Sequence, residues 1–125
     1  MKTWLIIGSL FAFSGILASS LSSHAIKDTL FLNASYDSFV LAQNLLIFHG
    51  LAIIVYAYLA EKLKLKLLNY ATVGIAVGIL FFSSSIFIKG LTGTFPLGFL
   101  TPVGGALMML GWLLSVLSFV LFKRN

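Results

Sequence analysis

Residues 67–88 carry the sequence LLNYATVGIAVGILFFSSSIFI, an unbroken run of 22 residues without Asp, Glu, Lys or Arg. A helix rises about 1.5 Å per residue, so this run is long enough to cross roughly 30 Å of hydrocarbon. Three more uncharged apolar runs occupy residues 4–21, 39–60 and 99–122, and the four runs together take up 86 of 125 residues. The sequence therefore predicts an all-α integral membrane protein, with one domain over residues 1–125 built as a four-transmembrane-helix bundle.

Composition excludes several classes of protein. Hydrophobic residues make up 60% of the chain and charged residues 9%, which is too little polar surface for a water-soluble domain. The net charge is +5, but no basic patch alternates with aromatic residues on a polar surface, so we expect no nucleic-acid partner. The chain has no Cys, which excludes disulfides, thiolate metal sites and cysteine nucleophiles.

The distribution of positive charge predicts the orientation. Four crossings place both termini and the middle loop on one face, which then carries six of the eight Lys and Arg residues, against two on the other face, Lys27 and Lys89. The positive-inside rule therefore predicts cytoplasmic termini. Residues 1–25 also resemble a secretory signal, but their apolar run is longer than a usual signal core, so we interpret it as the first transmembrane helix.

Two loops carry further predictions. The middle loop, residues 61–66, has the sequence EKLKLK, and Lys62, Lys64 and Lys66 can meet anionic lipid headgroups, each contact being worth about 1 kcal/mol. Topology anchoring alone explains these lysines more simply. In residues 22–38, apolar and polar side chains alternate, which indicates a short interfacial or re-entrant helix after the first span.

Small residues follow one face of the first, third and fourth predicted helices. The stripes comprise Gly8, Ala12, Gly15, Ser19 and Ser22; Ala71, Gly74, Gly78 and Ser85; and Gly104, Gly111, Ser115 and Ser118. Membrane helices associate by close backbone approach at such residues. The stripes therefore predict helix contacts, within this chain or with a second copy in a homo-oligomer or larger complex.

His49 is the most unusual residue of the predicted spans, because ionisable groups near the bilayer midplane are costly and mark functional sites by default. It fits a proton relay or substrate contact, or a neutral ring bonded to a neighbouring helix. Trp112 lies at matching depth in the fourth span, and its indole N–H needs an acceptor when buried. A hydrogen bond from Trp112 to His49 accounts for both residues and favours the structural interpretation.

The remaining candidate groups have simpler explanations. His24 and His49 lie at different depths and are too few for a zinc site. Ser83, Ser84 and Ser85 either line a polar cavity or bond back to the preceding turn. Thr101 is expected to cap the fourth helix, with Pro102 in its first turn and Gly104 and Gly105 allowing tight packing.

The motifs also carry a resemblance. Residues 82–93, FSSSIFIKGLTG, resemble an F-S-G-S…L-T-G stretch, and residues 101–105 with Gly111 and Trp112 resemble T-P-x-G-G…G-W. Residues 48–52, FHGLA, are similar to Y-H-A-L-A, and His24 with Lys27 fits G-A-H-x-L-K. These are features of the YgdD/YwdK-like family of small bacterial membrane proteins, domain-of-unknown-function family 423. The resemblance implies a multi-pass four-helix protein of the bacterial inner membrane, and no agreed activity. Ser19, Ser22 and Ser84 stand where the family usually has Gly, and Ser23 where it has Ala.

We therefore expect a non-enzymatic accessory or scaffolding membrane protein that contacts lipid and has no cofactor and no metal. The alternative is a small transporter or channel that uses His49, since Asp28, Asp37 and Glu61 are all expected in loops. The candidate functional or motif residues are His24, Lys27, His49, Ser83, Ser85, Thr92, Gly93, Thr101, Pro102, Gly104, Gly105 and Trp112.

Overall fold

The computed structural model describes residues 1–124, so Asn125 of the predicted domain lies outside the described residues. Within that range the chain is helical, with no strand. The helices are α1 (Lys2–Ser23), α2 (Lys27–Leu32), α3 (Tyr36–Lys62), α4 (Lys66–Thr92) and α5 (Leu100–Val120). All but α2 are long and apolar enough to span a membrane, which confirms the predicted fold class.

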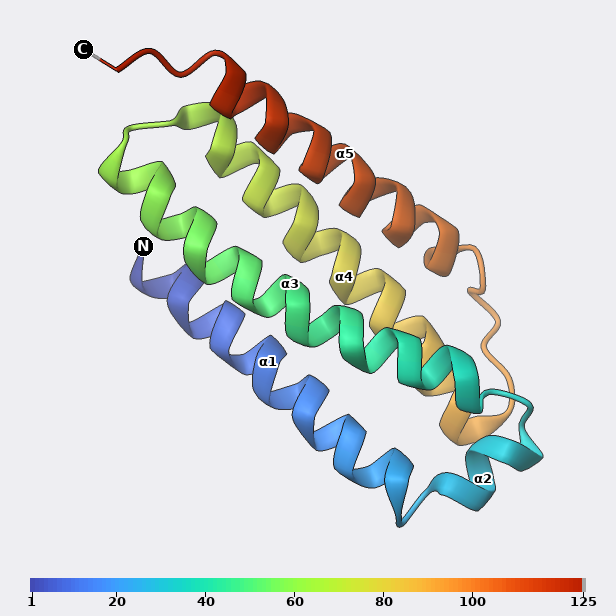
Figure 1. The fold of residues 1–125 in the computed structure, drawn as a ribbon. Helices are drawn as coiled ribbons and strands as arrows, with labels where there is room; N and C mark the ends of the chain where they lie inside the picture. The colour runs from blue at the N-terminus through green and yellow to red at the C-terminus, as the bar shows by residue number, and fades with distance from the viewer. Residues whose placement is uncertain (125) are drawn as a thin grey trace.

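The four long helices lie side by side and alternate in direction (Figure 1). Backbone contacts link α1 to α3, α3 to α4, and α4 to α5, so α3 and α4 form the centre of the bundle. The N-terminus, the α3–α4 turn and the C-terminal segment lie at one end, and α2 and the α4–α5 loop lie at the other (Figure 1). This arrangement places both ends of the described chain and the middle loop at the same end of the bundle, as predicted.

Small residues bring the backbones of neighbouring helices together at two crossings. A Cβ atom added to Gly50 of α3 would lie 2.6 Å from the carbonyl oxygen of Gly8 in α1. A Cβ atom on Gly78 of α4 would likewise lie 2.7 Å from the carbonyl oxygen of Gly104 in α5. Since real Cβ atoms do not approach that closely, glycine is needed at both crossings. The small-residue stripes therefore pack helices of this same chain.

Gly105 departs from that pattern. A Cβ atom built on it meets no atom within 4 Å. The expected tight packing is therefore confirmed for Gly104 and wrong for Gly105. The two glycines are adjacent on a helix, so they point about 100° apart and cannot both face α4.

The short helix α2 packs against the end of the bundle that lies opposite the termini. Its Leu30 is fully buried beside Ala18 of α1 and Phe39 of α3, whereas Leu32 is exposed. Just after α2, the Asn33 side chain donates a hydrogen bond of 2.7 Å from Nδ2 to the carbonyl oxygen of Gly90, near the end of α4. A short helix after the first span was predicted, and the structure contains it.

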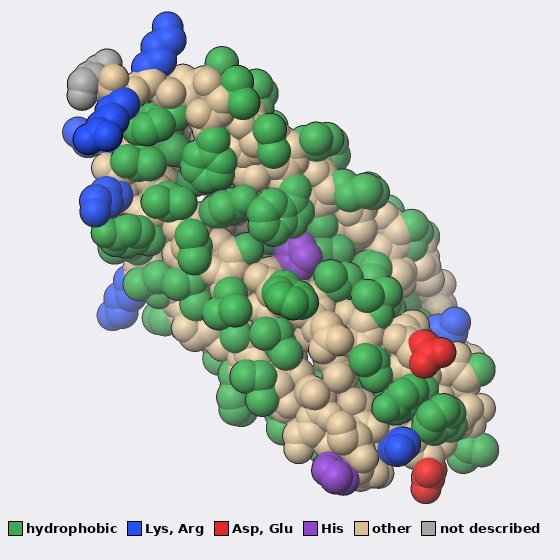
Figure 2. All heavy atoms as spheres, in the orientation of Figure 1, with side chains coloured by type: hydrophobic (Ala, Val, Ile, Leu, Met, Phe, Trp, Pro, Cys, Tyr) green, Lys and Arg blue, Asp and Glu red, His purple; other side chains and the backbone are tan. Residues whose placement is uncertain are grey.

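Charged side chains gather at the bundle ends, with Lys and Arg concentrated at the end that carries the termini (Figure 2). The N-terminal amino group lies 3.6 Å from a carboxylate oxygen of Glu61. The prediction that all three acidic residues lie in loops is wrong in detail. Asp28 and Asp37 lie in the first turns of α2 and α3, where the helix dipole favours negative charge, and Glu61 lies in the last turn of α3.

Candidate functional site: a polar cluster between α3 and α5

His49 lies on α3, halfway along the bundle, and is buried. The surface midway along the bundle is mostly hydrophobic (Figure 2). The Nδ1 atom of His49 lies 2.7 Å from the carbonyl oxygen of Leu45, one turn earlier in α3. The indole Nε1 of Trp112 on α5 donates to His49 Nε2 over 3.1 Å. The hydrogen bond predicted between these two residues is therefore confirmed.

A second hydrogen bond joins the same two helices seven residues further along α3. The Tyr56 hydroxyl donates to Ser115 Oγ over 3.0 Å, and Ser115 Oγ donates to the carbonyl oxygen of Trp112 over 2.7 Å. The rings of Tyr56 and Trp112 meet edge to face, with centroids 5.4 Å apart. Residues seven apart share a helix face, so His49 and Tyr56 present one polar edge to α5. These bonds connect α3 and α5, which have no close backbone contact.

The partners of His49 determine its protonation state at this site. An indole nitrogen only donates and a backbone carbonyl only accepts. Nε2 must therefore present its lone pair to Trp112, and Nδ1 must carry the proton that Leu45 accepts. Both ring nitrogens are occupied in the neutral Nδ1–H form. No carboxylate lies beside them, since the three acidic residues are at helix ends, so the cluster has no acid–base pair.

One buried polar contact was not predicted from the sequence. Ser22 of α1 donates from Oγ to Gln43 Oε1 of α3 over 2.8 Å, and both side chains are buried. Gln43 and its neighbour Asn44 are amides within a mainly apolar run, which is the signal that could have identified the contact. Ser22 is also one of the positions at which the resemblance described above implies Gly, and here its hydroxyl has a partner.

Thr101 does not cap α5 as predicted. It lies inside the first turn, and the N-cap residue is Phe99, without a side-chain cap. The Thr101 hydroxyl instead lies 2.6 Å from Ser85 Oγ on α4, because the first turn of α5 faces α4. Pro102 lies in the first turn as predicted, where no N–H is needed.

The three serines of α4 show both predicted roles, and Ser84 combines them. Ser84 and Ser85 bond back to the carbonyl oxygens of Phe81 and Phe82. Ser83 Oγ is buried with no hydrogen-bond partner. Ser83 and Ser84 also line a hollow of about 180 Å³ together with Ser14 of α1.

The other motif residues lie at the α2 end of the bundle. Thr92 Oγ1 bonds the carbonyl oxygens of Ile88 and Thr94, and Gly93 ends α4 with φ at 85°, a conformation that favours glycine. His24 and Lys27 are exposed; His24 ends α1 as its C-cap, and Lys27 is the first residue of α2. No three His, Asp or Glu side chains among residues 1–124 are placed to hold a metal ion.

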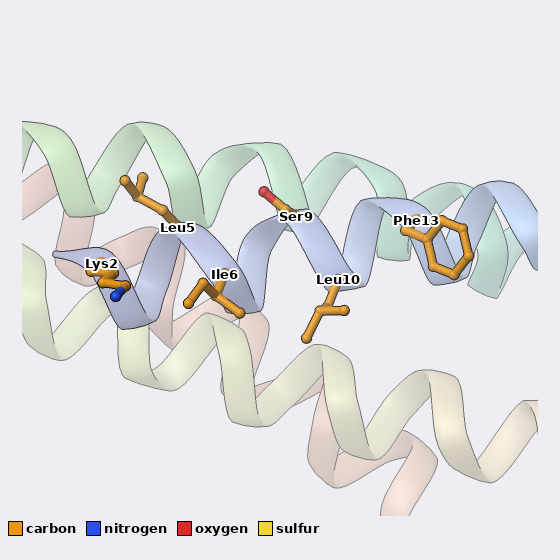
Figure 3. A pocket seen from close by; sticks show the side chains of 6 residues that line it. All are labelled: Lys2, Leu5, Ile6, Ser9, Leu10 and Phe13. Atoms are coloured by element: carbon orange, nitrogen blue, oxygen red, sulfur yellow. The ribbon is translucent and has the colours of Figure 1, made fainter.

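A hollow of about 460 Å³ on the surface is not a convergent site. It is lined by α1 alone, through Lys2, Leu5, Ile6, Ser9, Leu10 and Phe13 (Figure 3). Side chains from a single helix form a shallow surface, whereas ligand sites are concave and combine groups from several elements. We therefore regard it as part of the apolar surface that faces lipid.

Sequence comparison with known proteins identifies the family of this chain. The family model described as "Protein of unknown function (DUF423)" matches residues 18–105. The chain belongs to this family. The match runs from the end of α1 to the second turn of α5, so it includes His49 and Thr101 but not Trp112.

Relatives match over nearly the whole DUF423 chain. A UPF0382 membrane protein of Staphylococcus epidermidis is 31% identical, with 98% of each chain covered. The UPF0382 membrane protein of Staphylococcus haemolyticus is 30% identical over 94% of this chain and 95% of its own. The UPF0382 membrane protein YwdK of Bacillus subtilis is 26% identical over 96% of this chain and 98% of its own. No solved structure matches. This chain is thus a membrane protein of a family whose molecular function is unknown.

Proposed function

We propose that this protein is a non-enzymatic scaffolding or accessory component of the bacterial inner membrane, where it packs against lipid, further copies of itself or a larger complex. One observation carries the proposal: both nitrogens of His49, the unusual ionisable group of the spans, are used to hold α3 to its own backbone and to α5. A histidine whose two ring nitrogens are both hydrogen-bonded in this way stabilises the contact between two helices.

The contrast with a transporter supports this proposal. A proton-carrying histidine must exchange protons at a free nitrogen, and Nε2 here accepts from Trp112, which has no second hydrogen to offer. Proton uptake at Nε2 would break that bond and place two N–H groups against each other. The polar side chains next to His49 are Trp112 and, further along, Tyr56 and Ser115, which are themselves bonded across the helices.

The orientation of the protein is also a proposal. Six of the eight basic residues lie at the end that carries the termini and the α3–α4 turn. We infer from the positive-inside rule that this end is cytoplasmic. At the turn, Lys64 and Lys66 line a hollow of about 310 Å³ with Ser118, whose Oγ is buried and unpartnered. These lysines, with Lys62, are suited to meet anionic headgroups of the inner leaflet.

A flux measurement tests the scaffold against the transporter. Wild-type protein and His49→Gln are reconstituted into liposomes that contain a pH-sensitive dye, and a pH step is applied across the membrane. The scaffold predicts proton flux no greater than in empty liposomes for both proteins. A flux in the wild type that His49→Gln abolishes, with the fold intact by circular dichroism, would establish the transporter instead.

A second measurement addresses the partner. The protein is extracted from its native membrane in a lipid-preserving polymer, and the co-purifying proteins and their stoichiometry are determined. A scaffold is expected to retain a partner, or further copies of itself, in a fixed ratio. A population made up entirely of single chains with bulk lipid would contradict the proposal.

A further inference from the structure

A cleft with both polar and apolar walls opens at the end of the bundle opposite the termini, between the start of α3, the last turns of α4 and the first turn of α5. It has a volume of about 380 Å³. Its lining includes the polar side chains of Ser38, Ser85, Lys89 and Thr101 and the apolar side chains of Ile86 and Phe95. We call it the Lys89 cleft. Unlike the hollow on α1, it draws side chains from three helices and the α4–α5 loop.

One wall of the cleft carries a cation without a carboxylate partner, the exposed Lys89. Lys89 forms no ion pair, since the one ion pair among residues 1–124 joins the N-terminal amino group to Glu61 at the other end of the bundle. Asp37 precedes Ser38 in the first turn of α3, but its carboxylate is more than 4 Å from the Lys89 ammonium. An ammonium group at the edge of the hydrocarbon, with hydroxyl groups around it, is suited to an anion.

The hydroxyl pair in the cleft can change its donor direction. Ser85 donates to the carbonyl oxygen of Phe82 over 2.9 Å, so in this state Thr101 donates to Ser85 across 2.6 Å. Either oxygen of the pair can be the donor. If Ser85 turns its hydrogen towards Thr101, the Thr101 hydrogen becomes available to a ligand in the cleft. The pair can therefore serve an acceptor ligand without leaving any hydroxyl unpaired.

The start of α5 does not itself supply donors. The N–H groups of Leu100, Thr101 and Val103 bond to carbonyl oxygens of Leu97, Gly98 and Phe99, and Pro102 has no N–H. The first turn of α5 therefore offers an anion no free backbone N–H group, and the side-chain donors of the cleft remain. The available set is one ammonium group and a small number of hydroxyl groups, beside the apolar surfaces of Ile86 and Phe95.

We propose that the Lys89 cleft binds the phosphate group of an anionic phospholipid from the leaflet at that end of the bundle. Lys89 supplies the positive charge and Thr101 a hydrogen bond to a phosphate oxygen, while Phe95 and Ile86 contact the start of the lipid's apolar portion. Lys89 lies one turn from the end of α4, the depth at which headgroup phosphates meet the hydrocarbon. This site does not depend on the scaffold proposal, since a transporter could hold the same lipid.

Native mass spectrometry of the full chain, titrated with dioleoyl phosphatidylglycerol in detergent micelles, tests the site. Lys89→Gln should weaken lipid binding about fivefold, the equivalent of ~1 kcal/mol per lysine. Thr101→Val should weaken it about threefold, as expected for the loss of one membrane hydrogen bond. The matched control is Lys27→Gln, which removes an exposed lysine at the same end but outside the cleft and should change binding less than twofold.

The outcomes separate the alternatives. Equal weakening by Lys89→Gln and Lys27→Gln would show general attraction to charge and overturn the site. Thr101→Val also removes the bond to Ser85, so if it unfolds, the comparison of the two lysine variants decides. Millimolar inorganic phosphate is added in a second titration. If lipid remains bound, a lipid phosphate is the ligand; if inorganic phosphate displaces it from the wild type but not from Lys89→Gln, the ligand is a free phosphate and the lipid assignment is wrong.

Discussion

The hydrogen bond between Trp112 and His49 can be measured by a double-mutant cycle. His49→Leu removes the acceptor and leaves the indole N–H of Trp112 unpaired. Trp112→Phe removes the donor but keeps an aromatic ring for the edge-to-face contact with Tyr56. The pair of substitutions therefore isolates the hydrogen bond from most of the aromatic packing around it.

The expected magnitude is modest. Hydrogen bonds between membrane helices average about 0.6 kcal/mol in measured cycles and reach about 1.7 kcal/mol. The 3.1 Å distance and the burial of His49 suit a value within that range. We expect the double mutant to be destabilised by less than the sum of the two single mutants. The difference, which is the coupling free energy, should lie between these two values. His49→Gln should keep most of the stability, because an amide oxygen can accept from the indole.

The assay is reversible unfolding in detergent or bicelles, followed for the four proteins of the cycle. The control cycle pairs His49→Leu with Leu32→Ala, an exposed residue of α2 at the end of the bundle, and should be additive within about 0.5 kcal/mol. A ¹⁵N spectrum of the His49 ring at pH 7 should show the neutral Nδ1–H tautomer. Additive behaviour of His49→Leu and Trp112→Phe, or a ring that carries its proton on Nε2, would refute the structural role.

Three further predictions follow from topology and packing. A reporter fused to the C-terminus, or inserted at Lys64, should be active in the cytoplasm, and one near Ser35 should report outside; a C-terminal fusion active outside would contradict the charge argument. Gly78→Leu should lower the unfolding free energy by about 1–3 kcal/mol or more, because its Cβ would lie 2.7 Å from the carbonyl oxygen of Gly104. Gly105→Ala should be neutral, because its Cβ would meet no atom within 4 Å. Equal thermal stability of the two variants in detergent would show that the α4–α5 crossing is misplaced. Asn33→Ala should cost about 1 kcal/mol by removing the bond to the Gly90 carbonyl, and hydrogen exchange at the end of α4 should accelerate there while the centre of α4 stays protected.

The spans could be predicted from sequence because their signal is strong and local. Length and the absence of charge decide whether a segment can cross hydrocarbon, and neither depends on the neighbouring helices. The helix ends were less accurate: α4 was expected over residues 67–88 and extends to Thr92, because a lysine near a span end can reach water with its long side chain and need not end the helix.

The hydrogen bond at the candidate site could be predicted because Trp112, a donor, and His49, an acceptor, were expected at the same depth in the membrane. Trp112 and His49 were the conspicuous polar groups near the middle of their spans, so pairing them needed no knowledge of helix rotation. Tyr56 and Ser115 lack that advantage, because a tyrosine can reach an interface and a serine can bond to its own helix. Their pairing depends on how α3 and α5 are rotated about their axes, which one sequence does not determine.

Thr101 illustrates the limit most sharply. A threonine followed by proline at the start of a helix fits an N-cap, and that local rule placed its hydroxyl on its own backbone. In the structure the helix begins two residues earlier, with Phe99 as its N-cap, and the close approach of α4 and α5 at Gly78 and Gly104 sets the first turn of α5 against Ser85. A hydroxyl group has one hydrogen and several possible acceptors, so a tertiary contact can redirect it at little cost. The same freedom allows Thr101 to turn towards a ligand in the Lys89 cleft, a role that an N-cap bond would have prevented.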